Sequence, residues 1–224
     1  MEKIFAVFFL FLFLILSKNF SVFAQTVNDT VNVDFSQQIA TGYSSIFGVT
    51  QTPDDANSMS ILQNDGVTFV RQDLSLDTFV TSADPNTWDK GSENYIANKF
   101  LQAKAHNMKT MMIIDYTPIW LSFNGQTNGV PNNWTTWESI VKNTLTYFKS
   151  QNALPDYYEI WNEPGDAYQD QFFDVTNSGM TKNQAYDLLY LHSWNAIKAV
   201  DTNGKIGGPA DYQPDSAVTN ITYM

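Results

Sequence analysis

The chain contains no cysteine, only two histidines and about half as many basic as acidic residues. Without cysteine it can form neither disulfides nor thiolate metal sites. The 12 lysine and arginine residues stand against 23 aspartate and glutamate residues, and the resulting formal net charge of −11 repels the phosphates of nucleic acid. The composition therefore excludes a disulfide scaffold and argues against a nucleic-acid partner.

Long apolar runs are also absent, except at the start of the chain. After Lys3, about 13 apolar residues run from Ile4 to Leu16, and the small-x-small pattern of a cleavage site ends at Ala24. A bilayer span needs roughly 20 apolar residues, which makes a membrane anchor the weaker interpretation. We predict that residues 1–24 are a secretory signal peptide. Residues 25–224 would then be secreted, extracellular and free of the membrane after cleavage.

Short apolar or β-branched segments alternate with longer segments of helical periodicity. Strands are expected at about 45–49, 67–71, 109–115, 156–161 and 205–209, and helices at about 55–64 and 92–107 and from 135 and 181 onwards. Capping boxes at Thr135–Glu138 and Thr181–Gln184 are expected to start the last two helices. This alternation predicts an α/β fold with a parallel sheet, either doubly wound or a (β/α)8 barrel.

Polar side chains follow the expected strands. Both candidate folds gather binding groups at the carboxyl ends of their strands. No Gly-x-Gly-x-x-Gly follows the first strand, so a dinucleotide-binding fold gains no support. The residues at these positions are Arg71 and Asp73, Asp115 and Tyr116, and Asn162 and Glu163.

The segment Trp161-Asn162-Glu163-Pro164 resembles the strand-four signature of the clan A glycoside hydrolases. Residues 116–122 resemble the loop after strand three in families 39, 5 and 30, and residues 205–210 resemble strand five of family 39. The resemblance spans about residues 46–210. It implies a (β/α)8 TIM barrel of which about the first five βα units are present, so residues 25–224 would be an incomplete catalytic domain.

The resemblance also implies an activity, the retaining hydrolysis of O-glycosidic bonds in a poly- or oligosaccharide. Glu163 matches the catalytic acid/base, Asn162 the residue that binds the sugar 2-hydroxyl, and Arg71 the arginine that hydrogen-bonds the nucleophile. Tyr116 and Trp120 are expected to form walls against which sugar rings stack. Neither a cofactor nor a metal is implied.

These assignments have structural alternatives. Glu163 could be a solvated loop acid, and Asn162 could cap a turn before the proline. Arg71 could form an ion pair with Asp73 or Asp65, and Trp120 could belong to the core. Asp115, which we also place among the substrate-binding residues, could instead cap the following loop. His106 and His192 lie on separate helices without an acidic neighbour in sequence, and both are expected to be structural.

The second carboxylate of the catalytic pair would come from a seventh strand, and a (β/α)8 domain has about 250 residues. Glu93 and Glu138 stand at helix starts, and Glu159 lies inside strand four on the face expected for Trp161. We therefore expect an inactive N-terminal part of an active parent enzyme. The alternatives are a carbohydrate-binding barrel without catalysis and an unrelated exported α/β binding domain.

Overall fold

The computed structural model describes residues 47–165, 173–208 and 210. All of them belong to the compact unit Ser44–Met224, which is distinct from the unit Met1–Tyr43. The expected signal peptide at residues 1–24 lies outside the described residues. Among the helices that are described, none is long and apolar enough to cross a membrane.

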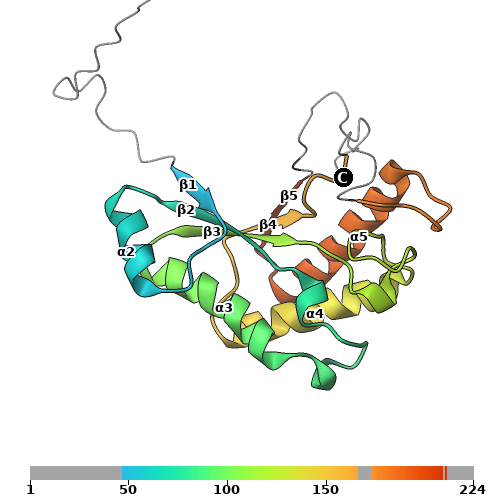
Figure 1. The fold of residues 1–224 in the computed structure, drawn as a ribbon, viewed down its shortest axis with the longest axis horizontal. Helices are drawn as coiled ribbons and strands as arrows, with labels where there is room; N and C mark the ends of the chain where they lie inside the picture. Colours follow the sequence, from blue (N-terminus) through green and yellow to red (C-terminus); the bar gives the residue numbers. More distant parts are fainter. Residues whose placement is uncertain (1–46, 166–172, 209, 211–224) are drawn as a thin grey trace, which may run out of the picture. The chain divides into compact units, whose positions relative to one another are not determined.

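Five parallel strands form one sheet in the order of the chain: β1 (Gly48–Thr50), β2 (Phe69–Asp73), β3 (Lys109–Ile114), β4 (Tyr157–Ile160) and β5 (Lys205–Gly207). All five predicted strands are present. The order β1-β2-β3-β4-β5 never reverses, whereas a doubly wound sheet reverses at its switch point. The sheet is therefore of the barrel type (Figure 1).

The helices connect successive strands: α2 (Ala56–Asn64), α3 (Lys90–Ala105), α4 (Trp134–Ser150) and α5 (Lys182–Val200). Short 3-10 turns stand in the loops at Leu76–Thr78, Pro85–Thr87 and Ile119–Leu121. Since right-handed crossovers that always step in one direction keep their helices on one side, α3, α4 and α5 line the same face of the sheet (Figure 1).

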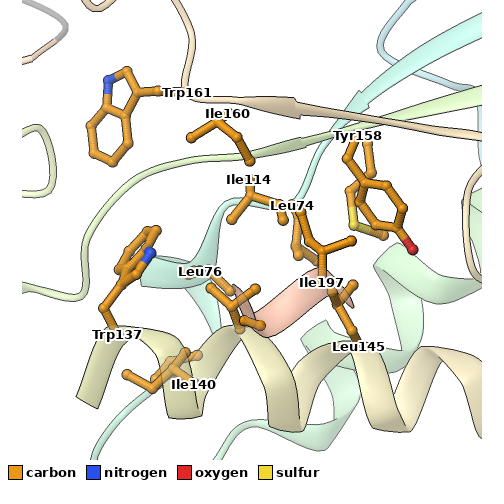
Figure 2. Packing of buried hydrophobic residues seen from close by; sticks show 14 of the residues in the cluster. Leu74, Leu76, Ile114, Trp137, Ile140, Leu145, Tyr158, Ile160, Trp161 and Ile197 are labelled. Carbon is orange, nitrogen blue, oxygen red and sulfur yellow. The ribbon is translucent and has the colours of Figure 1, made fainter. Parts of the chain in front are cut away.

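The two faces of the sheet differ in chemistry because side chains alternate along a strand. Toward the helices, the strands place apolar residues over α4. The apolar side chains along one face of α4 are buried against them (Figure 2). These residues are Leu74, Met112, Ile114, Tyr158 and Ile160 from the strand side, and Trp137, Ile140, Val141, Leu145 and Phe148 from α4. The opposite face carries charged side chains, among them Arg71 and Glu159, which are hydrogen-bonded to each other.

The start of α4 differs from the prediction. The helix begins at Trp134, and Asn133 is its N-cap, with its side chain accepting the Thr136 N–H at 2.9 Å. The predicted capping box from Thr135 to Glu138 is therefore wrong. Asparagine is at least as good an N-cap as threonine, and the Glu138 carboxylate contacts His192 Nδ1 at 2.9 Å instead of the backbone. By contrast, the capping box of Thr181 and Gln184 at α5 is confirmed.

Candidate active site

The carboxyl ends of β2, β3 and β4 bring the predicted site residues to one edge of the sheet. The strands are parallel, and in register Arg71 lies beside Met111 while Ile113 lies beside Glu159. The prediction that Arg71 and Asp73 follow a strand is wrong, because β2 runs two residues further than expected and contains both. Arg71 consequently points from the middle of a strand rather than from a loop.

Arg71 joins two residues of the neighbouring β4 segment. Its Nε donates to Glu159 Oε2 at 2.9 Å, and its Nη2 donates both to Glu159 Oε1 and, at 2.9 Å, to Asn162 Oδ1. The hydrogen bond that Arg71 donates to Glu159 raises the pKa of Arg71; burial opposes this shift and the negative charge of Glu159 adds to it. Of the two acids considered as ion-pair partners, neither Asp73 nor Asp65 forms a salt bridge with Arg71 in the described part of the chain.

The backbone at the end of β4 leaves the extended conformation abruptly. Trp161 has φ 64° and Glu163 has φ 51°, values in the left-handed region that bulky residues rarely adopt. The turn at Trp161 directs its indole into the core beside Trp137 (Figure 2), at 6.4 Å between ring centroids. The expectation that Trp161 shares a face with Glu159 is therefore wrong, because strand alternation ends at residue 160.

Glu163 is half-buried and is held through its backbone by the end of β5. Its N–H donates to the Ala210 carbonyl at 3.0 Å, and Asn162 forms a parallel bridge with the same residue. The side chain of Asn162 is fixed by Arg71 and its backbone by Ala210. Left-handed residues of this kind cluster at functional sites, where surrounding structure stabilises them. The geometry thus supports Glu163 as a functional residue.

Tyr116 stands at the end of β3 next to this turn. It too has a left-handed backbone, at φ 54°, and its ring lies 6.0 Å from that of Trp161. Burial, with smaller contributions from neighbouring carboxylates that include Glu163, raises the pKa of Tyr116 to about 12. The phenol is therefore neutral at physiological pH and available as a hydrogen-bond donor. Its predicted role as a wall of a sugar site stays a prediction.

Trp120 lies on the loop after β3 and is not a core residue. Its side chain is exposed, with a relative accessibility of 39%, while its Nε1–H donates to the Val80 carbonyl at 3.1 Å. One edge of the indole is thus anchored and much of the ring faces solvent. This arrangement suits a stacking surface, and the predicted role of Trp120 as a wall of a sugar site stays a prediction.

Asp115 is fully buried, and neither of its carboxylate oxygens has a hydrogen-bond partner among the residues that the structure describes. The alternative that Asp115 caps the following loop is therefore not supported, although its backbone carbonyl does accept the Leu76 N–H at 3.2 Å. Burial is the main cause that raises the pKa of Asp115 well above its ordinary value, with the charges of Asp73 and Asp77 adding to it. Its substrate-binding role remains a prediction, since the carboxyl does not reach solvent here.

The loops after β3 and β4 are fastened together near this site. Asn124 Nδ2 donates to Asp174 Oδ2 at 2.7 Å, and Gly129 forms a parallel bridge with Asp174. A side chain at Gly129 would collide with Asn124 Oδ1, at 2.0 Å from an ideal Cβ. These polar contacts brace the segment that follows Glu163 against the loop that carries Trp120.

Glu159 is the functional candidate that sequence reasoning missed. It lies 88 residues from Arg71 and on a strand separated from β2 by β3, so no local pattern links the two. A signal existed in the alternation along β4, because Glu159 stands between Tyr158 and Ile160 and therefore faces away from the apolar side. Among the described residues, no group of three or more histidines, aspartates or glutamates could hold a metal ion.

Several solved glycoside hydrolases share this fold at low sequence identity. A family 30 subfamily 8 xylanase from Clostridium acetobutylicum matches with a TM-score of 0.54 and 14% identity, over 73% of this chain and 41% of that chain. The virulence factor SghA from Agrobacterium tumefaciens matches with a TM-score of 0.52 and 12% identity, over 72% of this chain and 39% of that chain. The chain therefore shares the α/β barrel-type fold of these structures.

A conserved exported protein from Bacteroides fragilis has the same barrel fold, with a TM-score of 0.53 and 12% identity over 74% of this chain and 43% of that chain. This chain spans less than half the length of all three structures. No family model matches the sequence. The strand order and the likeness to these structures both support a barrel fold. In such barrels the functional sites lie at the carboxyl ends of the strands, which is where β2 to β4 bring the predicted site residues together.

Proposed function

We propose that this chain is part of a secreted retaining glycoside hydrolase that cleaves O-glycosidic bonds of a poly- or oligosaccharide, with Glu163 as its acid/base. The observation that carries the proposal is the position of Glu163. It stands in a left-handed turn at the end of β4, directly after an asparagine that Arg71 holds, in a fold shared with glycoside hydrolases.

The proposed reaction is a double displacement. In the first step, a carboxylate from another part of the barrel attacks the anomeric carbon while Glu163 donates its proton to the departing glycosidic oxygen. In the second step, Glu163 removes a proton from water, and the resulting hydroxide equivalent displaces the enzyme carboxylate from the sugar. The two carboxyl groups would lie about 5–5.5 Å apart.

The neighbouring side chains fit supporting roles in this scheme. Asn162 would bind a hydroxyl of the sugar at the bond that is cleaved. Tyr116 and Trp120 would contact the apolar C–H faces of sugar rings, since both follow β3 and neither ring is fully buried. Arg71 keeps Nη1 without a hydrogen bond among the described residues, so it could still donate to the attacking carboxylate.

The proposal is tested with the protein expressed from its complete reading frame. We expect it to release reducing sugar from xylan or from aryl β-glycosides, and proton NMR of the first product to show the same anomeric configuration as the substrate. Inversion of configuration would contradict the retaining mechanism. Sugar binding by calorimetry without hydrolysis would favour a non-catalytic carbohydrate-binding barrel, and the absence of both would refute the proposal.

A further inference from the structure

The contacts of Arg71 link a buried glutamate to the asparagine beside Glu163. Glu159 is only 6% exposed and takes two hydrogen bonds from the guanidinium, one from Nε and one from Nη2. A bidentate pair of this kind fixes the plane of the guanidinium as well as its position. The same Nη2 group then donates its second hydrogen to Asn162 Oδ1 at 2.9 Å.

This last hydrogen bond determines which end of the Asn162 amide faces Arg71. A guanidinium only donates hydrogen bonds, so its partner must be the amide oxygen and not the amide nitrogen. The Nδ2 group of Asn162 makes no hydrogen bond among the described residues, and the residue is partly exposed. Asn162 consequently offers two N–H donors to a ligand group that accepts hydrogen bonds.

We infer that Glu159 is a positioning residue, which acts through Arg71 to hold the Asn162 carboxamide with its N–H donors toward the substrate. The inference rests on the proposed function, because it assigns Glu159 a task in the same site. Glu159 itself contacts Arg71 and does not touch the reacting atoms.

A purely structural role for Glu159 would neutralise the charge of Arg71 and do nothing more. The two roles predict different results for Asn162. Because Nη2 of Arg71 donates to both Glu159 and Asn162, a positioning role requires that loss of the Glu159 hydrogen bond also changes the hydrogen bond to Asn162. In Glu159→Gln, the side chain keeps its size but one acceptor becomes an N–H2 donor that opposes the guanidinium. The guanidinium plane is then no longer fixed, and the Asn162 amide loses its orientation.

The first measurement reads the Asn162 amide directly and needs no enzymatic activity. In a 15N–1H correlation spectrum, the Nδ2 signals of Asn162 are identified by their loss in Asn162→Asp. We expect Glu159→Gln to shift these signals, because the Oδ1 atom of the same amide loses its fixed hydrogen bond from Arg71. Glu93→Gln is the matched control, because Glu93 is also buried and paired with a cation, Lys90, at 2.7 Å.

Unchanged Asn162 signals in a folded Glu159→Gln protein would overturn the inference. If that variant does not fold, Arg71→Lys answers the same question, because a lysine ammonium cannot reproduce the planar three-bond arrangement. Persistence of the wild-type Asn162 signals in folded Arg71→Lys would likewise overturn it.

The second measurement separates this inference from the proposed function. If the protein from the complete reading frame hydrolyses glycosides, we expect Glu159→Gln to lower kcat/KM by about 10²-fold, as for a misplaced binding group. The loss should be the same for strongly and weakly basic leaving groups, because proton donation by Glu163 is untouched. A loss that grows with leaving-group basicity would contradict positioning, whereas an inactive wild type would count against the proposed function and leave the spectroscopic result decisive for Glu159.

Discussion

Asp115 shows at the level of a single residue how the site differs from an ordinary strand end. Its carboxyl is fully buried, has no hydrogen-bond partner in the described part of the chain, and is close enough to Asp73 and Asp77 for their charges to affect it. A buried carboxylate is costly to ionise, so the neutral acid is the stable form in the folded protein. The residue therefore couples folding to proton binding.

The stability of the protein should fall as pH rises because of Asp115. Its pKa in the folded state lies well above the unfolded value, so the native state retains the proton after the unfolded chain has released it. Below about pH 4 both states are protonated, and above that the unfolding free energy falls by up to about 1.4 kcal/mol per pH unit until the folded pKa is passed.

Asp115→Asn removes this titration and should gain stability over the wild type progressively over the pH range from about 4 upward. Urea unfolding across this range measures the difference, and the exposed Asp65→Asn controls for the change of residue type. A constant difference between Asp115→Asn and the wild type at all pH values would contradict the account.

Sequence reasoning recovered the elements better than the contacts of individual residues. The β-branched and apolar runs at residues 67–71 and 109–115 gave strands within two residues of their positions, because periodicity is a local property. The pair of Arg71 and Glu159 depends on which residues of two non-adjacent strands share a face. That choice depends on the register across β3, which no local pattern contains.

At the level of elements, the ends of helices and strands decide how the site is presented. The β4 strand stops where Trp161 adopts a left-handed backbone and places its indole beside Trp137 on α4. The strand pattern of alternating faces predicted the opposite direction, since it assumes that extended backbone continues. The start of α4 also differs from its predicted position. Both Asn133 and Thr135 could accept a hydrogen bond from the free N–H groups of the first helical turn, and Asn133 is the residue that does so.

The N-cap of α4 can be tested by stability. Asn133→Ala should lower the unfolding free energy by about 1 kcal/mol, because the Thr136 N–H loses its acceptor. Thr135→Ala, two residues later on an exposed part of the helix, should change it by less than about 0.5 kcal/mol. Chemical denaturation of both variants, made in bacteria, measures the two changes in unfolding free energy. A larger loss for Thr135→Ala than for Asn133→Ala would contradict the assignment of Asn133 as the N-cap and favour the capping box predicted from the sequence.

At the level of the whole molecule, the order of the strands determines the fold. Five parallel strands that follow one another in space, with helices on one face, are arranged as in a (β/α)8 barrel. The structures with this fold are more than twice as long as the matching region, so the chain corresponds to part of such a barrel. The strand–helix alternation is compatible with both a doubly wound sheet and a (β/α)8 barrel, and the strand order distinguishes them.

The most direct test concerns Glu163 as the proton donor, in the protein from the complete reading frame. Proton donation matters for a basic leaving group and little for a weakly basic one. Glu163→Gln should therefore lower kcat/KM by about 10²–10⁴-fold on a phenyl glycoside and by far less on the dinitrophenyl glycoside of the same sugar. Equal losses on both substrates, or wild-type rates on the phenyl glycoside, would contradict the assignment of Glu163 as the acid/base.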